Sequence, residues 1–112
     1  KKNSNIAFSD KEISKIFLKK IKHWDNGKRI IPVDLPFESR AREDFTAEMH
    51  HRNIASIVRY WQQELFAGRG RPPEILPSDE EVIKFVMANP YAIGYVSSKA
   101  KIDNVKVLKI IK

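Results

Sequence analysis

Residues 30–45 read IIPVDLPFESRAREDF and combine an apolar strand with the start of a helix. The run Ile30–Leu35 predicts a buried strand, which a proline ends. Ser39 is a typical helix N-cap, and the first turn after it carries Arg40 and Arg42. Because the first amides of a helix have no partner within it, and a guanidinium can grip an oxyanion with two hydrogen bonds, this segment is a candidate anion site. An ordinary capped surface helix with solvated arginines is the alternative.

An amphipathic helix precedes this segment. Ser9 and Glu12 have the spacing of a capping box, in which each side chain binds the other residue's backbone amide. Apolar residues then recur at helical spacing as far as Trp24, so we expect a helix that extends to about this residue, with its last turn undefined. A turn at Asp25–Gly27 follows.

The rest of the chain alternates helices and strands. We expect helices over about 39–49, from Asn53 to Gly68 and from Ser78 to Asn89, a loop at 68–73, strands at Ala92–Val96 and about 105–111, and a turn or short helical piece at 97–100. This order favours an α/β fold with a small central sheet flanked by helices. Because three strands make a thin sheet, we also expect a further strand at the N-terminus or a pairing partner.

The composition limits the class of protein. A chain of 112 residues predicts a single domain, and its 42% apolar content suffices for one core. No apolar run approaches the roughly 20 residues of a spanning helix. The chain has no cysteine, which excludes disulfides and thiolate sites and suits an exported protein. The net charge of +7 favours anionic partners, but the lysines are spread along the chain, so nucleic-acid binding is the less favoured reading.

The motifs of catalysis are missing. No nucleophile elbow and no phosphate-cradling glycine loop occurs in the sequence. His50 and His51 are adjacent, and neighbouring helical side chains point about 100° apart, so they do not readily share a metal ion. We therefore expect no enzyme activity, no metal site and no cofactor.

Four segments in order resemble a known family. They are IFLKKIKHWDNGKRIIPVDL at 16–35, SRAREDF at 39–45, YWQQELFAGRGRPPEIL at 60–76 and NPYAIGYV at 89–96, with VKVLKI as a closing strand. Together they resemble the phosphate-binding-protein-like family, short relatives of the substrate-binding proteins of bacterial phosphate ABC transporters in the type 2 periplasmic binding protein superfamily. The chain departs from the family pattern where Lys19 and Tyr91 replace glycines and where Glu38 enters the loop before Ser39.

The resemblance implies a single periplasmic-binding-protein-like lobe over residues 1–112, without the family's first strand, in an exported or periplasmic protein. It also implies phosphate or a related oxyanion as ligand. Ser39 would cap the helix and donate to the oxyanion, the amides of Arg40 and Ala41 would complete the nest, and Arg42 would supply charge. Arg69 and Arg71 are secondary candidates, for a ligand or for a partner.

One lobe offers half of a cleft, so a second copy or a partner protein would have to supply the other wall. Three functions follow. The first is a non-enzymatic solute-binding or transporter-associated accessory domain. The second is a protein-interaction module that has kept the fold and lost the ligand, with the sheet edge or the loop at 68–73 as its surface. The third, less favoured, is a basic nucleic-acid-binding domain.

Overall fold

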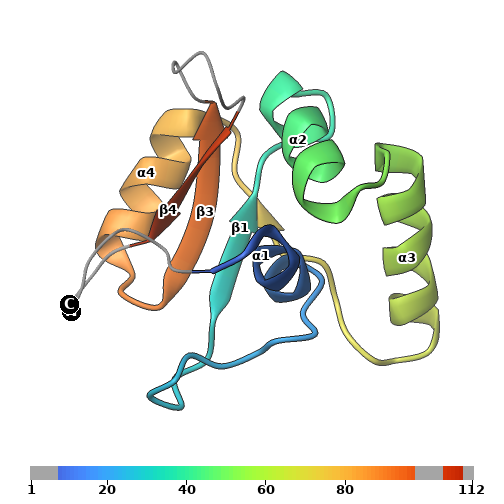
Figure 1. Ribbon diagram of the computed structural model, residues 1–112, viewed down its shortest axis with the longest axis horizontal. Helices are drawn as coiled ribbons and strands as arrows, with labels where there is room; N and C mark the ends of the chain where they lie inside the picture. The colour runs from blue at the N-terminus through green and yellow to red at the C-terminus, as the bar shows by residue number, and fades with distance from the viewer. Residues whose placement is uncertain (1–7, 98–104, 110–112) are drawn as a thin grey trace.

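The computed structural model describes residues 8–97 and, for the backbone alone, residues 105–109. Figure 1 shows the helices and strands that these residues form. In chain order they are α1 (Asp10–Phe17), β1 (Ile31–Asp34), α2 (Arg40–Phe45), the π-helix η1 (Thr46–His50), α3 (Ile54–Phe66), β2 (Glu74–Ile75), α4 (Asp79–Ala88), β3 (Ala92–Ser97) and β4 (Val105–Lys109). The chain is therefore a compact α/β protein, as its alternating pattern predicts.

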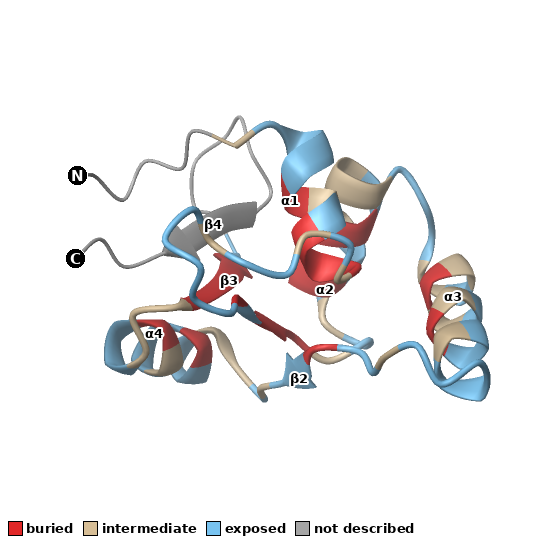
Figure 2. Ribbon diagram, turned by 90° about the horizontal axis from the view of Figure 1, so that it is seen from below, coloured by how far each residue is buried: buried red, intermediate tan, exposed pale blue. Residues whose placement is uncertain are grey.

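The sheet has the strand order β2-β1-β3-β4. The pairs β1–β2 and β1–β3 are parallel, whereas β4 pairs antiparallel with β3. Seen along the sheet, α1 and α2 lie on one face and α4 lies on the other (Figure 2). Covering both faces explains why β1 and β3 are apolar except for Asp34 and Ser97 at their ends, because the central strands of a parallel sheet are buried on both sides.

One core joins the sheet to the helices on both faces. Its largest buried side chains include Phe17, Phe45 and Tyr95, whose rings pack on one another. Gly94 of β3 lies where a Cβ atom would meet the Val82 and Val33 methyl groups at 2.8 and 2.9 Å. A glycine at this position therefore lets α4 approach the sheet closely.

Helix α1 is shorter than the apolar spacing predicts. It ends at Phe17, with Leu18 as its C-cap, and Lys19 follows in the left-handed conformation at φ 61°. Ile21 and Trp24 lie beyond the helix, yet both pack against the core as partly buried side chains. Their spacing was mistaken for helical continuation because side chains of a folded-back loop can reach the same core.

Two other elements differ from the expectation. The helix expected over 39–49 is present, but its second half winds as the π-helix η1. Strand β2 has only two residues and was not predicted, since two residues carry no periodicity. Residues 98–100 of the expected turn, the end of the last strand beyond Lys109 and any strand before Phe8 lie outside the described residues.

Helix α3 lies beside the sheet and not over it (Figure 2). It begins at the cap Asn53, as predicted, and Gly68 follows it at φ 72°. A small separate cluster of Ile57, Trp61 and Leu18 joins it to the rest of the molecule. In addition, the Tyr60 hydroxyl donates to the carbonyl of Leu18 at 3.0 Å. Helix α3 is therefore fixed to the end of α1.

Candidate functional site

Arg42, the charged group of the predicted anion site, is buried, and its guanidinium binds other residues of the fold. Its Nη1 donates to the carbonyl of Leu35 at 2.8 Å, and its Nε lies 3.5 Å from Oδ1 of Asp34. The guanidinium also lies over the ring of Phe37, 4.4 Å from its centroid. Only 3% of Arg42 is exposed. The prediction that this guanidinium faces an open pocket is therefore wrong, and the residue connects α2 to the end of β1.

The neighbours of Arg42 are helix-start residues. Ser39 caps α2 as predicted, since its Oγ accepts from the amide of Arg42 at 2.9 Å. Arg40 is exposed, and its Nε donates to Asp44 at 3.3 Å. Ala41 is buried in the core. None of these residues lines the pocket described next, and α2 itself has only six residues.

A cationic pocket lies instead between the end of α1, the residues before β1 and the loop after α3. Its volume is about 440 Å³. The basic residues that line it are Lys19, Lys22, Arg29, Arg69 and Arg71, and the other lining residues are Leu18, Trp61, Glu64 and Gly70. The two secondary candidates of the sequence analysis, Arg69 and Arg71, thus share one site with three basic residues from other segments.

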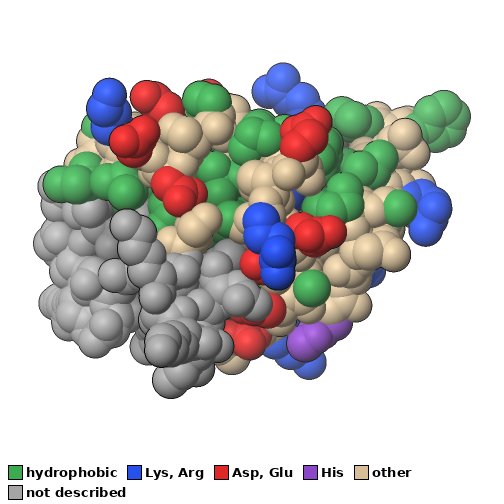
Figure 3. Space-filling model, turned by 90° about the horizontal axis from the view of Figure 1, so that it is seen from above, with side chains coloured by type: hydrophobic (Ala, Val, Ile, Leu, Met, Phe, Trp, Pro, Cys, Tyr) green, Lys and Arg blue, Asp and Glu red, His purple; other side chains and the backbone are tan. Residues whose placement is uncertain are grey.

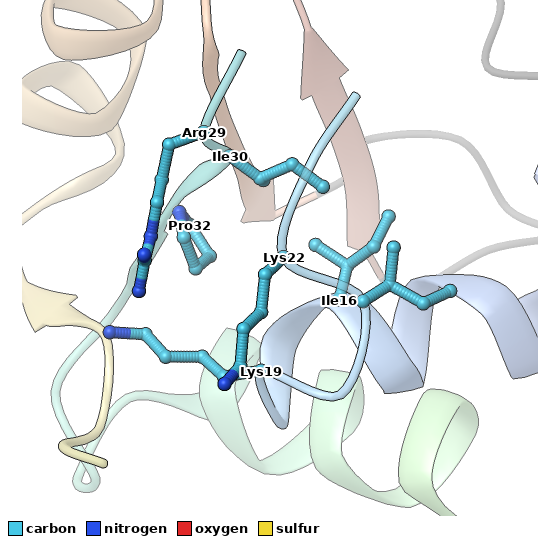
Figure 4. Close-up of a pocket in the computed structure, with 7 residues that line it drawn as sticks. Ile16, Lys19, Lys22, Arg29, Ile30 and Pro32 are labelled. Atoms are coloured by element: carbon cyan, nitrogen blue, oxygen red, sulfur yellow. The ribbon is translucent and has the colours of Figure 1, made fainter. Parts of the chain in front are cut away.

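Backbone contacts bring the first three cations together. The amide of Ile30 donates to the carbonyl of Lys22 at 2.9 Å, and His23 and Arg29 form an isolated antiparallel bridge. The turn after α1 therefore lies against the residues that lead into β1. Figure 4 shows the Lys19 side chain extended toward the guanidinium of Arg29. Both side chains, with Lys22, also line a smaller adjoining pocket of about 30 Å³.

Lys19 carries two unfavourable features at this site. Its backbone has φ 61°, a conformation that L residues other than Asn and Asp seldom adopt. Its pKa is lowered, first by burial and then by neighbouring positive charges. Those charges belong to Arg29, Arg71 and Lys22. The side chain is therefore held among like charges on a backbone that would suit glycine better.

The five cations differ in whether a carboxylate neutralises them. Arg69 donates through Nε and Nη2 to Oε2 of Glu64, at 3.0 and 2.9 Å, and this pair raises the pKa of Arg69. Within the described part of the chain, Lys19, Lys22, Arg29 and Arg71 have no carboxylate at ion-pair distance. Four positive charges therefore face this opening without a counter-charge from the described residues.

The floor of the pocket is apolar and fixed. Leu18 and Trp61 are each 6% exposed and belong to the cluster that anchors α3. The ring of Trp61 packs edge-on against that of Tyr60, whose hydroxyl binds the end of α1. This packing sets the distance between the lysines after α1 and the arginines after α3.

Two polar pairs lie outside the pocket, one buried and one partly buried. Tyr95 donates its hydroxyl to Oδ1 of Asp34 at 2.5 Å, and burial raises the pKa of Tyr95 so that the proton stays on the phenol. His50 and Ser14 are joined by a 2.6 Å hydrogen bond, and burial lowers the pKa of this histidine to about 4. Each pair joins two elements of the fold. Among the described residues, no three His, Asp or Glu side chains cluster as metal ligands would.

Comparisons of the chain with known protein families, with characterised proteins and with solved structures find no match. The phosphate-binding-protein-like resemblance therefore stays a prediction that rests on short motifs. Among the described residues, no helix is long and apolar enough to cross a membrane.

Sequence reasoning missed three residues of the pocket as site residues: Lys19, Lys22 and Arg29. The sequence predicts the first two on a continuous helix, where residues three apart share a face, but it gives no sign of the turn that brings Arg29 beside them. Nothing in the local sequence marks Lys19 as a residue with a left-handed backbone, so the end of α1 was not visible there.

Proposed function

We propose that this chain is a non-enzymatic binding domain for oxyanions and that the cationic pocket is its binding site. One observation carries the proposal. Four basic side chains from three separate segments converge on one opening without a carboxylate partner among the described residues. They are Lys19, Lys22, Arg29 and Arg71.

Repulsion among the cations of the pocket favours the binding of an anion. Like charges held together repel each other, and the lowered pKa of Lys19 reflects that repulsion. An anion in the pocket would replace the repulsion with charge-assisted hydrogen bonds, which are stronger than neutral ones. A concave site with an apolar floor also concentrates the field of its charges more than a flat surface does. The pocket therefore favours an oxyanion over a neutral solute.

The resemblance stated above agrees with this ligand class but places it elsewhere. It implies phosphate at Ser39–Arg42, whereas the pocket lies at the end of α1 and the loop after α3. We keep phosphate as the reference ligand for a test. An exported location and an association with a transporter are proposed from the resemblance alone.

A thermal-shift titration with phosphate and with sulfate tests the proposal. A ligand present at 100 times its Kd stabilises a protein by about 2.7 kcal/mol, which is readily measured as a rise in Tm. Arg71→Ala should reduce the rise, because Arg71 is exposed, lines the pocket and has no ion-pair partner in the described chain. Arg40→Ala is the control, since Arg40 is also exposed and lies at the site that the sequence predicts.

The outcomes of this titration are distinct. A rise in Tm that Arg71→Ala reduces and Arg40→Ala leaves intact supports the cationic pocket. A rise in Tm that only Arg40→Ala reduces indicates that the anion binds at the start of α2. No rise with either anion, up to concentrations at which salt acts non-specifically, refutes oxyanion binding.

A protein-interaction module is the second candidate, and one surface favours it. Phe66, at the end of α3, is 97% exposed, and the adjacent Leu65 is 50% exposed. Figure 3 shows hydrophobic side chains on the surface at the end of the molecule where α3 lies. Light scattering coupled to size exclusion tests self-association through this surface. A dimer that Phe66→Ser dissociates supports it, and a wild-type monomer at high concentration rules out self-association.

A further inference from the structure

Resting on the proposed oxyanion site, we infer that its ligand is an oligophosphate, with two or more linked phosphate groups, and not a single phosphate. Three features of the pocket carry this inference: the number of unpaired cations, the three chain segments that supply them, and the volume of the pocket.

The charge of the pocket exceeds that of one phosphate. Lys19, Lys22, Arg29 and Arg71 each carry a positive charge without a carboxylate partner in the described ranges. A single phosphate group carries roughly two negative charges at most near pH 7. An oligophosphate adds charge with each linked group and can therefore neutralise all four cations at once.

The cations also come from three separate segments of the chain. Lys19 and Lys22 follow α1, Arg29 precedes β1, and Arg71 lies in the loop after α3. A single phosphate would have to share its few oxygens among cations from all three segments. A chain of linked phosphates has more oxygens, and each group can accept from a different cation.

The space is larger than a single oxyanion uses. The pocket of about 440 Å³ falls in the range of roughly 300–1,000 Å³ that holds ligands of drug size. The adjoining pocket of about 30 Å³, lined by Lys19, Lys22 and Arg29, extends the basic surface toward Pro32. Figure 4 shows these three side chains around that extension.

The remaining polar group on the wall does not oppose the ligand. Glu64 lines the pocket, but its carboxylate accepts both hydrogen bonds from Arg69. This pair is locally neutral, so the carboxylate of Glu64 is already engaged and the other four cations stay without a counter-charge among the described residues. Leu18 and Trp61 also line the pocket, but each is only 6% exposed, so they offer an organic group little apolar surface.

Isothermal titration calorimetry on the full chain tests the inference at one fixed ionic strength without divalent cations. The probes are orthophosphate, pyrophosphate, tripolyphosphate, ATP and, as a trivalent anion without phosphate, citrate. We expect tripolyphosphate to bind at one site per chain, at least tenfold more tightly than orthophosphate and more tightly than citrate. Arg71→Ala should weaken tripolyphosphate about tenfold, whereas Arg40→Ala should not.

The outcomes separate this inference from the proposed function. Equal affinity for orthophosphate and tripolyphosphate overturns the oligophosphate ligand and leaves an oxyanion site in place. Citrate binding as tightly as tripolyphosphate, or several tripolyphosphate ions per chain, also overturns it, since either result indicates charge attraction without a built site. No binding of any probe overturns both proposals. Equal affinity for ATP and tripolyphosphate assigns recognition to the phosphates, and tighter ATP binding adds the nucleoside to a supported oligophosphate site.

Discussion

Replacement of Lys19 by glycine should stabilise the fold and weaken anion binding in the same molecule. Lys19 follows the C-cap of α1 at φ 61°, the place and conformation in which helices commonly have glycine. The side chain reaches into the cationic pocket and is half-buried there. The change would relieve the strain of the left-handed backbone, and it would remove one of the four unpaired charges of the pocket.

The magnitude follows from two opposing terms. The left-handed conformation costs a residue with a Cβ roughly 1–2 kcal/mol, which glycine avoids. Glycine returns about 0.5–1 kcal/mol of this, because it makes the unfolded chain more flexible. The variant also loses the repulsion from Arg29, Arg71 and Lys22. This loss adds a few tenths of a kcal/mol to its free energy of unfolding, about what a partly screened charge contributes. We expect a net gain of about 1 kcal/mol, or a rise of roughly 3–6 °C in Tm for a domain of this size.

Urea denaturation and calorimetric titration with tripolyphosphate measure the two effects on the same preparations. Lys19→Ala is the matched control, because alanine removes the charge and keeps the left-handed cost. Both variants should bind tripolyphosphate about tenfold more weakly than the wild type. Only Lys19→Gly should be more stable than the wild type by the margin given above.

A less stable Lys19→Gly would refute the backbone argument, since it would mean that packing of the lysine stem outweighs the strain. Unchanged tripolyphosphate affinity in both variants would refute the role of Lys19 in the pocket. The two results are independent, so each half of the reasoning can fail alone.

Three further predictions concern the fold. Arg42→Ala should lower the free energy of unfolding by about 3–5 kcal/mol in urea, because it leaves Asp34 buried without its counter-charge, and a loss below 1 kcal/mol would contradict that role. Gly94→Ala should cost about 1–3 kcal/mol by the same assay, since its Cβ would lie 2.8 Å from a Val82 methyl, and an unchanged Tm would show that α4 can move away. His50 has a pKa of about 4 in the folded state, below its ordinary 6.5, so the unfolded chain takes up the proton first as the pH falls. Between pH 7 and pH 4 the wild type should therefore lose on the order of 2–3 kcal/mol more than His50→Gln does, and equal losses would show that the histidine is not held neutral.

Local signals in the sequence predict most of the secondary structure. The caps Ser9, Ser39, Asn53 and Ser78 each accept from an amide three residues on, because capping depends on short-range geometry that the sequence displays directly. The order of α1, β1, α2, α3, α4, β3 and β4 follows from these caps and from apolar periodicity. The α/β class was therefore predictable without tertiary information.

The candidate site was not predictable in the same way. The partners of Arg42 are the carboxylate of Asp34 and the carbonyl of Leu35, and the sequence offers no sign that this arginine turns inward. The pocket depends on a left-handed lysine and on a turn that returns the chain to β1. Apolar periodicity reveals neither the left-handed lysine nor the turn, because the apolar residues after Lys19 keep helical spacing although the helix has ended. Charges from three distant segments meet only once the chain has folded.

The attachment of α3 has a consequence for how the protein would respond to a bound anion. This helix is held by Leu18, Ile57 and Trp61 together with one hydrogen bond from Tyr60, whereas the sheet shares the main core. Its amides should therefore exchange with deuterium sooner than those of β1 and β3. A polyanion that contacts both Arg71, in the loop after α3, and Lys22, in the turn after α1, would link these two segments, so a bound anion should slow deuterium exchange along α3.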